Sequence, residues 1–289
     1  MEQLIQHVIN GAMVGSTYAV VAVGFALTFS VLRVINVAHP EVFMLAMFTG
    51  LVVVQALTQN FLIVLVIAAT AALVAGLAIE RAVLRPLRRA DLLMPMIATA
   101  GVSVFLQYGV QGVAGPDELR FPRILPFAPL EVGAITVTSL QLITFGIAVL
   151  ILLGCSFYVR RTRWGLAARA VAERPDIAAT FGVNVSRVAQ ITVGLSSFMA
   201  GAAGVGIAVL YGSAWSFVGL LYGLKSWVCM LVAGNRHIEA VMLVGIMLGI
   251  LEALTTAYVS SSFRDAVAFV VLIVVLYKRP DGLFGSYSY

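Results

Sequence analysis

The chain has 289 residues, of which 61% are hydrophobic and 11% are charged, and its mean hydropathy is +1.04. Soluble domains carry about 25% charged residues, so this composition excludes an ordinary soluble domain and predicts an all-α polytopic membrane protein. The net charge of +5 does not indicate a nucleic-acid partner, because the basic residues lie between apolar runs and not along one soluble face.

The first half of the chain contains five apolar runs that are long enough to cross a bilayer, at residues 8–30, 40–57, 61–79, 93–112 and 137–158. The N-terminus lacks the basic region of a cleavable signal peptide, so we expect the first run to remain in the mature protein. Cys155 and Cys229 both lie in apolar runs, which favours buried, unpaired cysteines over a disulfide or a metal pair.

The polar segments between these runs indicate which side each faces. Residues 80–91 have a basic excess, as cytoplasmic loops do, whereas residues 113–136 have none and are expected outside. Residues 33–41 form a compact polar turn, and Pro40 suits the first turn of the second helix.

Residues 160–187 form a central basic loop, with six arginines against Glu173 and Asp176, and this excess predicts a cytoplasmic position. Residues 164–172 and 176–181 can each form a short helix. Pro175 separates the two helices and Gly182 ends the second one.

Three further runs follow, at residues 188–211, 217–232 and 240–258, and a last span ends near Lys278. The run 217–232 covers only about 24 Å of a core that is about 30 Å thick. The sequence therefore predicts nine crossings with the N-terminus outside and the C-terminus inside, or eight if this run is re-entrant.

Two segments share the pattern His-x-Glu-x-x-Met-Leu, at residues 39–45 and 237–243. Both would open an outward-going span, which is the relation expected of a parallel repeat, although two short matches also arise by chance. Glu252 lies in the middle of a span, where a charge costs about 2.5 to 3.5 kcal/mol, so it is expected to face protein or water. A structural pairing with an arginine or a hydroxyl, a place on a substrate path, and a protonated carboxylate all fit it.

No catalytic or nucleotide-binding motif is present in the sequence. Two classes of transporter remain: a permease driven by a separate motor subunit, and a self-contained, ion-coupled secondary carrier. A carrier needs buried ion-binding groups, which are scarce here, whereas a motor-driven permease needs a stiff cytoplasmic projection, which residues 160–187 provide.

Four segments of the chain resemble the permeases of ATP-driven (ABC) importers of the branched-chain amino acid family, specifically the shorter of their two permeases. These segments are Asn10-Gly11 with Gly15-Ser16-x-Tyr18-Ala19, residues 32–39, residues 164–184, and Arg279-Pro280-Asp281-Gly282-Leu283-Phe284-Gly285. Their order and spacing cover nearly the whole chain, which we interpret as one transmembrane permease domain, 1–289.

The resemblance implies that two cytoplasmic ABC ATPase subunits bind ATP and magnesium and that this chain binds no cofactor or metal. It also implies a second, homologous permease subunit, a periplasmic or extracellular solute-binding protein, and a place in the bacterial inner membrane. The implied ATPase-coupling residues are Trp164, Gly165, Arg169, Glu173, Asp176, Ala178, Ala179, Gly182 and Asn184. The candidate translocation-path residues are Asn10, Ser16, Tyr18, Asn36, His39, Glu41, Asn235, His237, Glu239 and Glu252.

The sequence departs from the family pattern at two places. Relatives usually have glycine where Pro40 stands, and a glycine-rich run where residues 232–238 stand. The sequence therefore leaves four solute classes to choose from, namely branched-chain amino acids, urea, short amides and aromatic acids.

Overall fold

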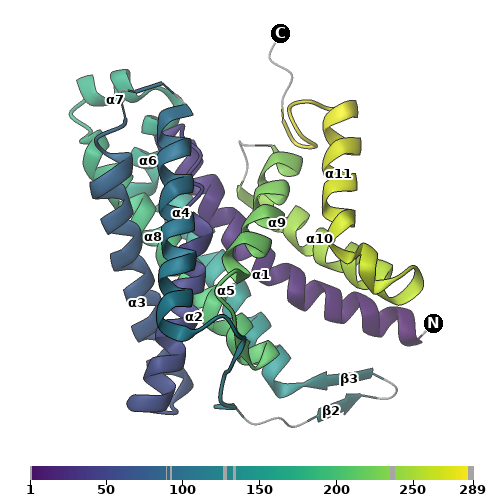
Figure 1. The fold of residues 1–289 in the computed structure, drawn as a ribbon. Helices are drawn as coiled ribbons and strands as arrows, with labels where there is room; N and C mark the ends of the chain where they lie inside the picture. The colour runs from purple at the N-terminus through teal and green to yellow at the C-terminus, as the bar shows by residue number, and fades with distance from the viewer. Residues whose placement is uncertain are drawn as a thin grey trace.

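The computed structural model of the protein describes residues 2–88, 90–91, 93–125, 129–132, 135–234 and 238–285. The α-helices of this part of the chain are α1 (Glu2–Leu32), α2 (His39–Ala56), α3 (Phe61–Ile79), α4 (Leu93–Ala114), α5 (Ser139–Arg161), α6 (Arg163–Glu173), α7 (Pro175–Thr180), α8 (Val185–Tyr211), α9 (Val218–Ala233), α10 (Ile238–Tyr258) and α11 (Arg264–Lys278). Figure 1 shows them as a helical bundle.

Seven of these helices are long and apolar enough to cross a membrane, namely α1, α2, α3 with its continuation to Leu84, α4, α5, α8 and α10. The predicted polytopic helical protein is thereby confirmed. The helices α9 and α11 are shorter, at 16 and 15 residues. The helix α11 begins at Arg264 and has Asp265 in its first turn.

Local signals set several of the helix ends. Pro40 occupies the first turn of α2, and the Asn60 side chain accepts hydrogen bonds from the first backbone N–H groups of α3. Thr138 and Gln141 form a reciprocal capping box at the start of α5. Asn184 caps α8 by accepting from the backbone N–H of Arg187 at 3.0 Å.

Two short antiparallel strand pairs lie in the segments that sequence analysis treated as loops. β1 (Leu119–Arg120) pairs with β4 (Ser213–Ala214), and Leu119 is opposite Ala214. β2 (Pro129–Val132) forms a hairpin with β3 (Ile135–Thr138). The strands are too short to show the alternating pattern that identifies a strand from sequence.

The core is built on α1 and α8, whose middle residues are almost all buried. Close packing depends on small residues: a Cβ atom on Gly15 would lie 2.7 Å from the carbonyl oxygen of Ile246 in α10. A Cβ on Gly245 would lie 2.7 Å from the backbone nitrogen of Ala19. Small residues thus allow the backbones of α1 and α10 to approach closely. Cys155 and Cys229 are buried and unpaired, as expected.

The two ends of α1 contact different loops. Near its start, the Gln6 amide donates to the carbonyl oxygen of Thr136 at 2.9 Å. Directly after its end, the Arg33 guanidinium donates to the carbonyl oxygen of Ala172 in α6. The hairpin and the basic loop therefore lie at opposite ends of the bundle, which Figure 1 also shows. We name these the outer end (the hairpin) and the inner end (α6 and α7).

Candidate functional site

A cluster of charged and hydroxyl side chains lies towards the outer end, where α1, α9, α10 and α11 meet. The Tyr18 hydroxyl donates to Glu252 Oε2 at 2.9 Å, and Lys225 Nζ lies 2.9 Å from Glu252 Oε1. Lys225 also lies 2.8 Å from Asp265 Oδ1, and Arg264 Nε lies 3.4 Å from Glu252 Oε2. We call Tyr18, Lys225, Glu252, Arg264 and Asp265 the outer cluster.

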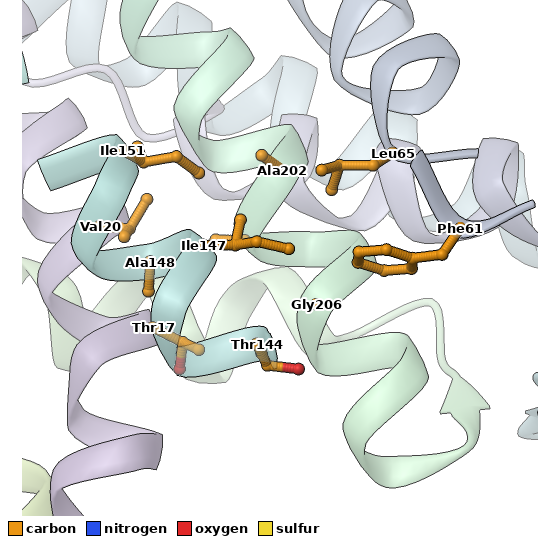
Figure 2. A pocket seen from close by; sticks show the side chains of 11 residues that line it. Thr17, Val20, Phe61, Leu65, Thr144, Ile147, Ala148, Ile151, Ala202 and Gly206 are labelled. Carbon is orange, nitrogen blue, oxygen red and sulfur yellow. The ribbon is translucent and has the colours of Figure 1, made fainter. Parts of the chain in front are cut away.

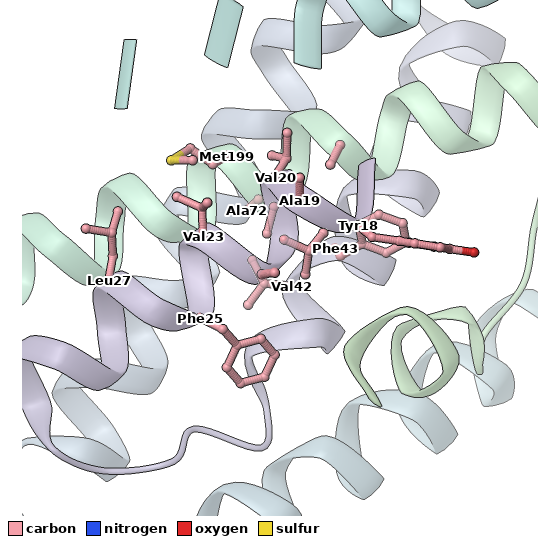
Figure 3. Close-up of a cluster of buried hydrophobic side chains, with 14 of the residues drawn as sticks. Tyr18, Ala19, Val20, Val23, Phe25, Leu27, Val42, Phe43, Ala72 and Met199 are labelled. Carbon is pink, nitrogen blue, oxygen red and sulfur yellow. The ribbon is translucent and has the colours of Figure 1, made fainter. Parts of the chain in front are cut away.

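Burial explains why these groups gather. The Glu252 side chain is only 2% exposed, and an unpaired carboxylate at that depth would be strongly unfavourable. Lys225 and Arg264 compensate its charge. Figure 3 shows Tyr18 at the edge of the apolar core, with its hydroxyl directed away from the other labelled side chains. Of the roles that the sequence left open for Glu252, the structural ion pair is present.

A pocket of about 290 Å³ adjoins this cluster. It is lined by Tyr18, Met47, Glu118, Ile207, Tyr211, Ser213, Trp215, Val218, Leu221, Tyr222, Lys225, Ser261, Arg264 and Asp265. We call it the outer pocket. Its wall combines charges of both signs with aromatic and aliphatic surface.

A second polar group lies deeper, where α2 begins. Glu41 Oε1 accepts from the Ser103 hydroxyl at 2.9 Å and from the Gln107 amide at 2.7 Å, and both donors come from α4. His39 packs edge-on against Phe25 with 4.8 Å between ring centroids. Neither ring nitrogen of His39 has a hydrogen-bond partner among the described residues.

A third polar group surrounds a cavity of about 750 Å³ near the inner end. It is lined by Ala26, Leu27, Ser30, Val31, Arg33, Val159, Arg160, Ala168, Arg169, Ala172, Glu173, Ile238, Glu239 and Val241. Glu239 accepts from Arg160 Nε at 2.7 Å and from the Ser156 hydroxyl at 3.2 Å. We call this space the inner cavity. It joins a predicted path residue, Glu239, to two predicted coupling residues, Arg169 and Glu173.

The three polar groups follow one another along α1. Tyr18 belongs to the outer cluster, Gly24 lies against His39, and Ser30 lines the inner cavity. Each of these positions lies six residues further along the helix than the one before, a rise of about 9 Å per step. The helix therefore passes a polar group at each of three depths.

The other predicted path residues have mainly local contacts, although Asn10 also accepts from the Gln141 amide of α5 at 3.5 Å. The Asn10 side chain accepts from the Gln6 amide at 3.1 Å, and the Ser16 hydroxyl donates to the Met13 carbonyl oxygen in its own helix at 2.7 Å. Asn36 accepts from the backbone N–H of Ala38 at 3.1 Å, just before α2. Asn235 and His237 lie outside the described residues.

The central loop folds as the two predicted short helices, α6 and α7. Pro175 lies at the start of α7, and Gly182 follows its end with a φ of +82°. Gly165 is buried because its backbone packs on that of Tyr158 and Val159, and Ala178 is buried as well. Gly165 therefore holds the start of the loop against the end of α5.

Other residues of the loop face outward. Ile177 is 49% exposed, Phe181 is 83% exposed, and Trp164 is 42% exposed. Asp176 and Ala179 are also exposed on α7. The loop therefore exposes three large apolar side chains at the inner end. Phe181 and Ile177 were not singled out from the sequence.

Sequence analysis also missed Lys225, which pairs with Glu252, and the Ser103 and Gln107 partners of Glu41. Lys225 had a usable signal, because it is a lone lysine within the apolar run 217–232. Ser103 and Gln107 had a weaker one, namely their spacing of one helical turn on α4.

A separate gap between α1, α3, α5 and α8 is lined mainly by apolar side chains and is shown in Figure 2. Its volume is about 10 Å³, which is the space of about one water molecule. It is a packing defect and not a solute site.

Comparisons with known proteins agree over nearly the whole chain. The family model described as branched-chain amino acid transport system, permease component, matches residues 7–276. The high-affinity branched-chain amino acid transport system permease proteins LivH of Escherichia coli (strain K12) and BraD of Pseudomonas aeruginosa are each 31% identical to this chain. Each alignment covers 97% of this chain and 95% of the relative.

The solved structure of PsaBC from Streptococcus pneumoniae in complex with Fab has a similar fold, with a TM-score of 0.52 at 12% identity. The match covers 94% of this chain and 91% of that one, and at this identity it shows the fold alone. The sequence-based prediction of a non-catalytic, multi-pass permease is confirmed by the family match. The chain belongs to the family of permease components of branched-chain amino acid transport systems.

Proposed function

We propose that the chain is one transmembrane permease domain, crossing the membrane eight or nine times, of an ATP-driven importer in the bacterial inner membrane. The observation that carries this proposal is the succession of polar groups along α1, from the outer cluster through Glu41 to the inner cavity. A solute path across a bilayer requires polar groups at successive depths, and these groups are costly unless protein or water surrounds them.

The proposed path residues differ in how directly they fit this role. Tyr18, Glu252, His39, Glu41 and Glu239 belong to the three polar groups. Asn10, Ser16 and Asn36 stay predictions, as do Asn235 and His237.

The proposed motor is a pair of cytoplasmic ABC ATPase subunits that bind ATP and magnesium. Coupling through α6 and α7 is supported by the exposed side chains of Ile177 and Phe181, which belong to a loop that packs on the end of α5 at Gly165. Movement of the loop would reach the path because Arg169 and Glu173 line the inner cavity together with Glu239. A homologous permease and a soluble binding protein complete the proposed assembly.

The proposed solute is a branched-chain amino acid. The printed names of LivH and BraD state this class for those proteins, and their similarity extends over nearly the full chain. The sequence departs from the family pattern at Pro40 and at residues 232–238. Urea, short amides and aromatic acids are therefore the other solute classes to be tested.

The coupling role is tested by Gly182→Trp, with Gly115→Trp as the matched control. Both glycines have positive φ, +82° and +91°, and a Cβ on either meets no atom within 4 Å. The left-handed conformation costs a side chain about 1–2 kcal/mol at each position. Gly182→Trp should abolish ATPase copurification and uptake, with membrane insertion intact, whereas Gly115→Trp should retain the ATPase. Equal retention of the ATPase and of uptake by both variants would remove the coupling role.

A further inference from the structure

We infer that the outer pocket binds the charged backbone groups of an α-amino acid, with the Arg264 guanidinium donating to its carboxylate and the Asp265 carboxylate accepting from its ammonium group. This inference rests on the proposed function and deepens it, since it assigns the solute class to named side chains. The two residues are consecutive at the start of α11, and both line the pocket.

Arg264 has donor capacity left for a ligand. Its contacts with Glu252 Oε2 and the Tyr211 hydroxyl are both long, at 3.4 Å, and its side chain is 37% exposed. A guanidinium carries five N–H donors in a planar fork that matches a carboxylate. Arg264 is therefore held in the pocket wall without its donors being used up.

Asp265 has acceptor capacity left as well. Its Oδ1 lies 2.8 Å from Lys225 Nζ, and the side chain is 62% exposed. A carboxylate offers two oxygens and about four lone-pair positions, so one lysine contact leaves room for an ammonium group. The buried pair of Lys225 and Glu252 lies beneath and fixes both residues.

The charge balance of the wall selects among solute classes. Of the residues that line the pocket, Lys225 and Arg264 are cationic, and Glu118 and Asp265 are anionic. Glu252 does not line the pocket and is paired with Lys225 behind it. A zwitterion satisfies both signs at once. An aromatic acid would bring a second anion next to Asp265, and urea or an amide would neutralise neither charge.

The size and the apolar part of the pocket fit the same class. Its volume of about 290 Å³ is close to the lower limit of about 300 Å³ found for small-molecule sites. Met47, Ile207 and Val218 line it with aliphatic surface that suits a branched side chain. The ligand that this wall predicts is therefore a single aliphatic amino acid.

The test uses the assembled transporter in detergent, without the binding protein, and the fluorescence of Trp215 in the pocket wall. Leucine, leucinamide, which lacks the carboxylate, and 4-methylpentanoate, which lacks the ammonium group, are titrated in turn. The fluorescence change that is lost in Trp215→Phe is the signal that comes from the pocket. We expect leucine to bind at least tenfold more tightly than either analogue.

Arg264→Gln and Asp265→Asn should each weaken leucine binding at least tenfold. Arg264→Gln should also reduce the preference for leucine over leucinamide, and Asp265→Asn should reduce the preference for leucine over 4-methylpentanoate. Arg120→Gln is the matched control, since Arg120 is exposed near the outer end and does not line the pocket. Unfolding temperatures within a few degrees of wild type separate loss of binding from loss of folding. If either variant fails to fold, the relative affinities of the wild-type protein for leucine and its two analogues test the inference.

Equal binding of the three ligands, or unchanged leucine binding in both variants, would overturn the inference. If the wild-type complex imports leucine with its binding protein and ATPase but shows no leucine binding at Trp215, the inference fails and the proposed function stands. If it imports no leucine under those conditions, the proposed function itself fails.

Discussion

Replacing Lys225 by methionine should destabilise the protein strongly, because it leaves the carboxylate of Glu252 buried with too little compensation. The two side chains are 9% and 2% exposed and lie 2.9 Å apart. Breaking a buried ion pair costs about 3–5 kcal/mol. The Tyr18 hydroxyl and Arg264 stay near Glu252, so we expect about 3 kcal/mol, the lower end of that range.

The double variant Lys225→Met, Glu252→Leu removes both charges and should recover most of this loss, since apolar replacement of a buried pair is often nearly neutral. The assay is the free energy of unfolding in mixed micelles for both single variants and the double variant. Arg160→Met is the control: its pair with Glu239 is as short, at 2.7 Å, but the side chains are 62% and 40% exposed. It should cost less than about 1 kcal/mol.

Two results would refute this reasoning. One is a Lys225→Met cost no larger than that of Arg160→Met. The other is a double variant whose cost equals the sum of the single costs, because the charges would then not be coupled.

The remaining predictions concern the coupling surface and the helix packing. Phe181→Ala should weaken ATPase docking about 30-fold, since covering a phenylalanine that is 83% exposed contributes about 2 kcal/mol. Phe105→Ala, which is 74% exposed on α4, should leave docking unchanged, and equal ATPase titration curves for the two variants would contradict this role for Phe181. Gly15→Leu should cost about 3 kcal/mol or more by forcing α1 away from α10, as measured by unfolding in micelles. Gly109→Leu, which meets no neighbour within 4 Å, should be near neutral, and similar losses in both would count against close α1 to α10 contact.

The parts of the fold that local chemistry determines could be predicted from the sequence. Pro175 and Gly182 were sufficient to divide the central loop into α6 and α7, because each residue acts on the backbone at its own position. Arginine excess likewise indicated that residues 113–136 and 160–187 belong to opposite ends.

Contacts that depend on how helices pack could not be predicted in this way. Tyr18 and Glu252 are 234 residues apart, and their hydrogen bond exists because glycines let α1 and α10 approach closely. The sequence shows Lys225 as a lone charge in an apolar run, but it does not show that Glu252 is its partner. Phe181 was not singled out for a different reason, since exposure of one apolar side chain is a property of the folded loop.

The most direct test of the account is leucine uptake into proteoliposomes that contain the permease pair and the binding protein, with and without the ATPase subunits. The account predicts uptake only when the ATPase subunits and ATP are both present, and loss of that uptake on deletion of residues 176–181. Uptake by the permease pair without ATPase subunits, driven by an ion gradient, would contradict it.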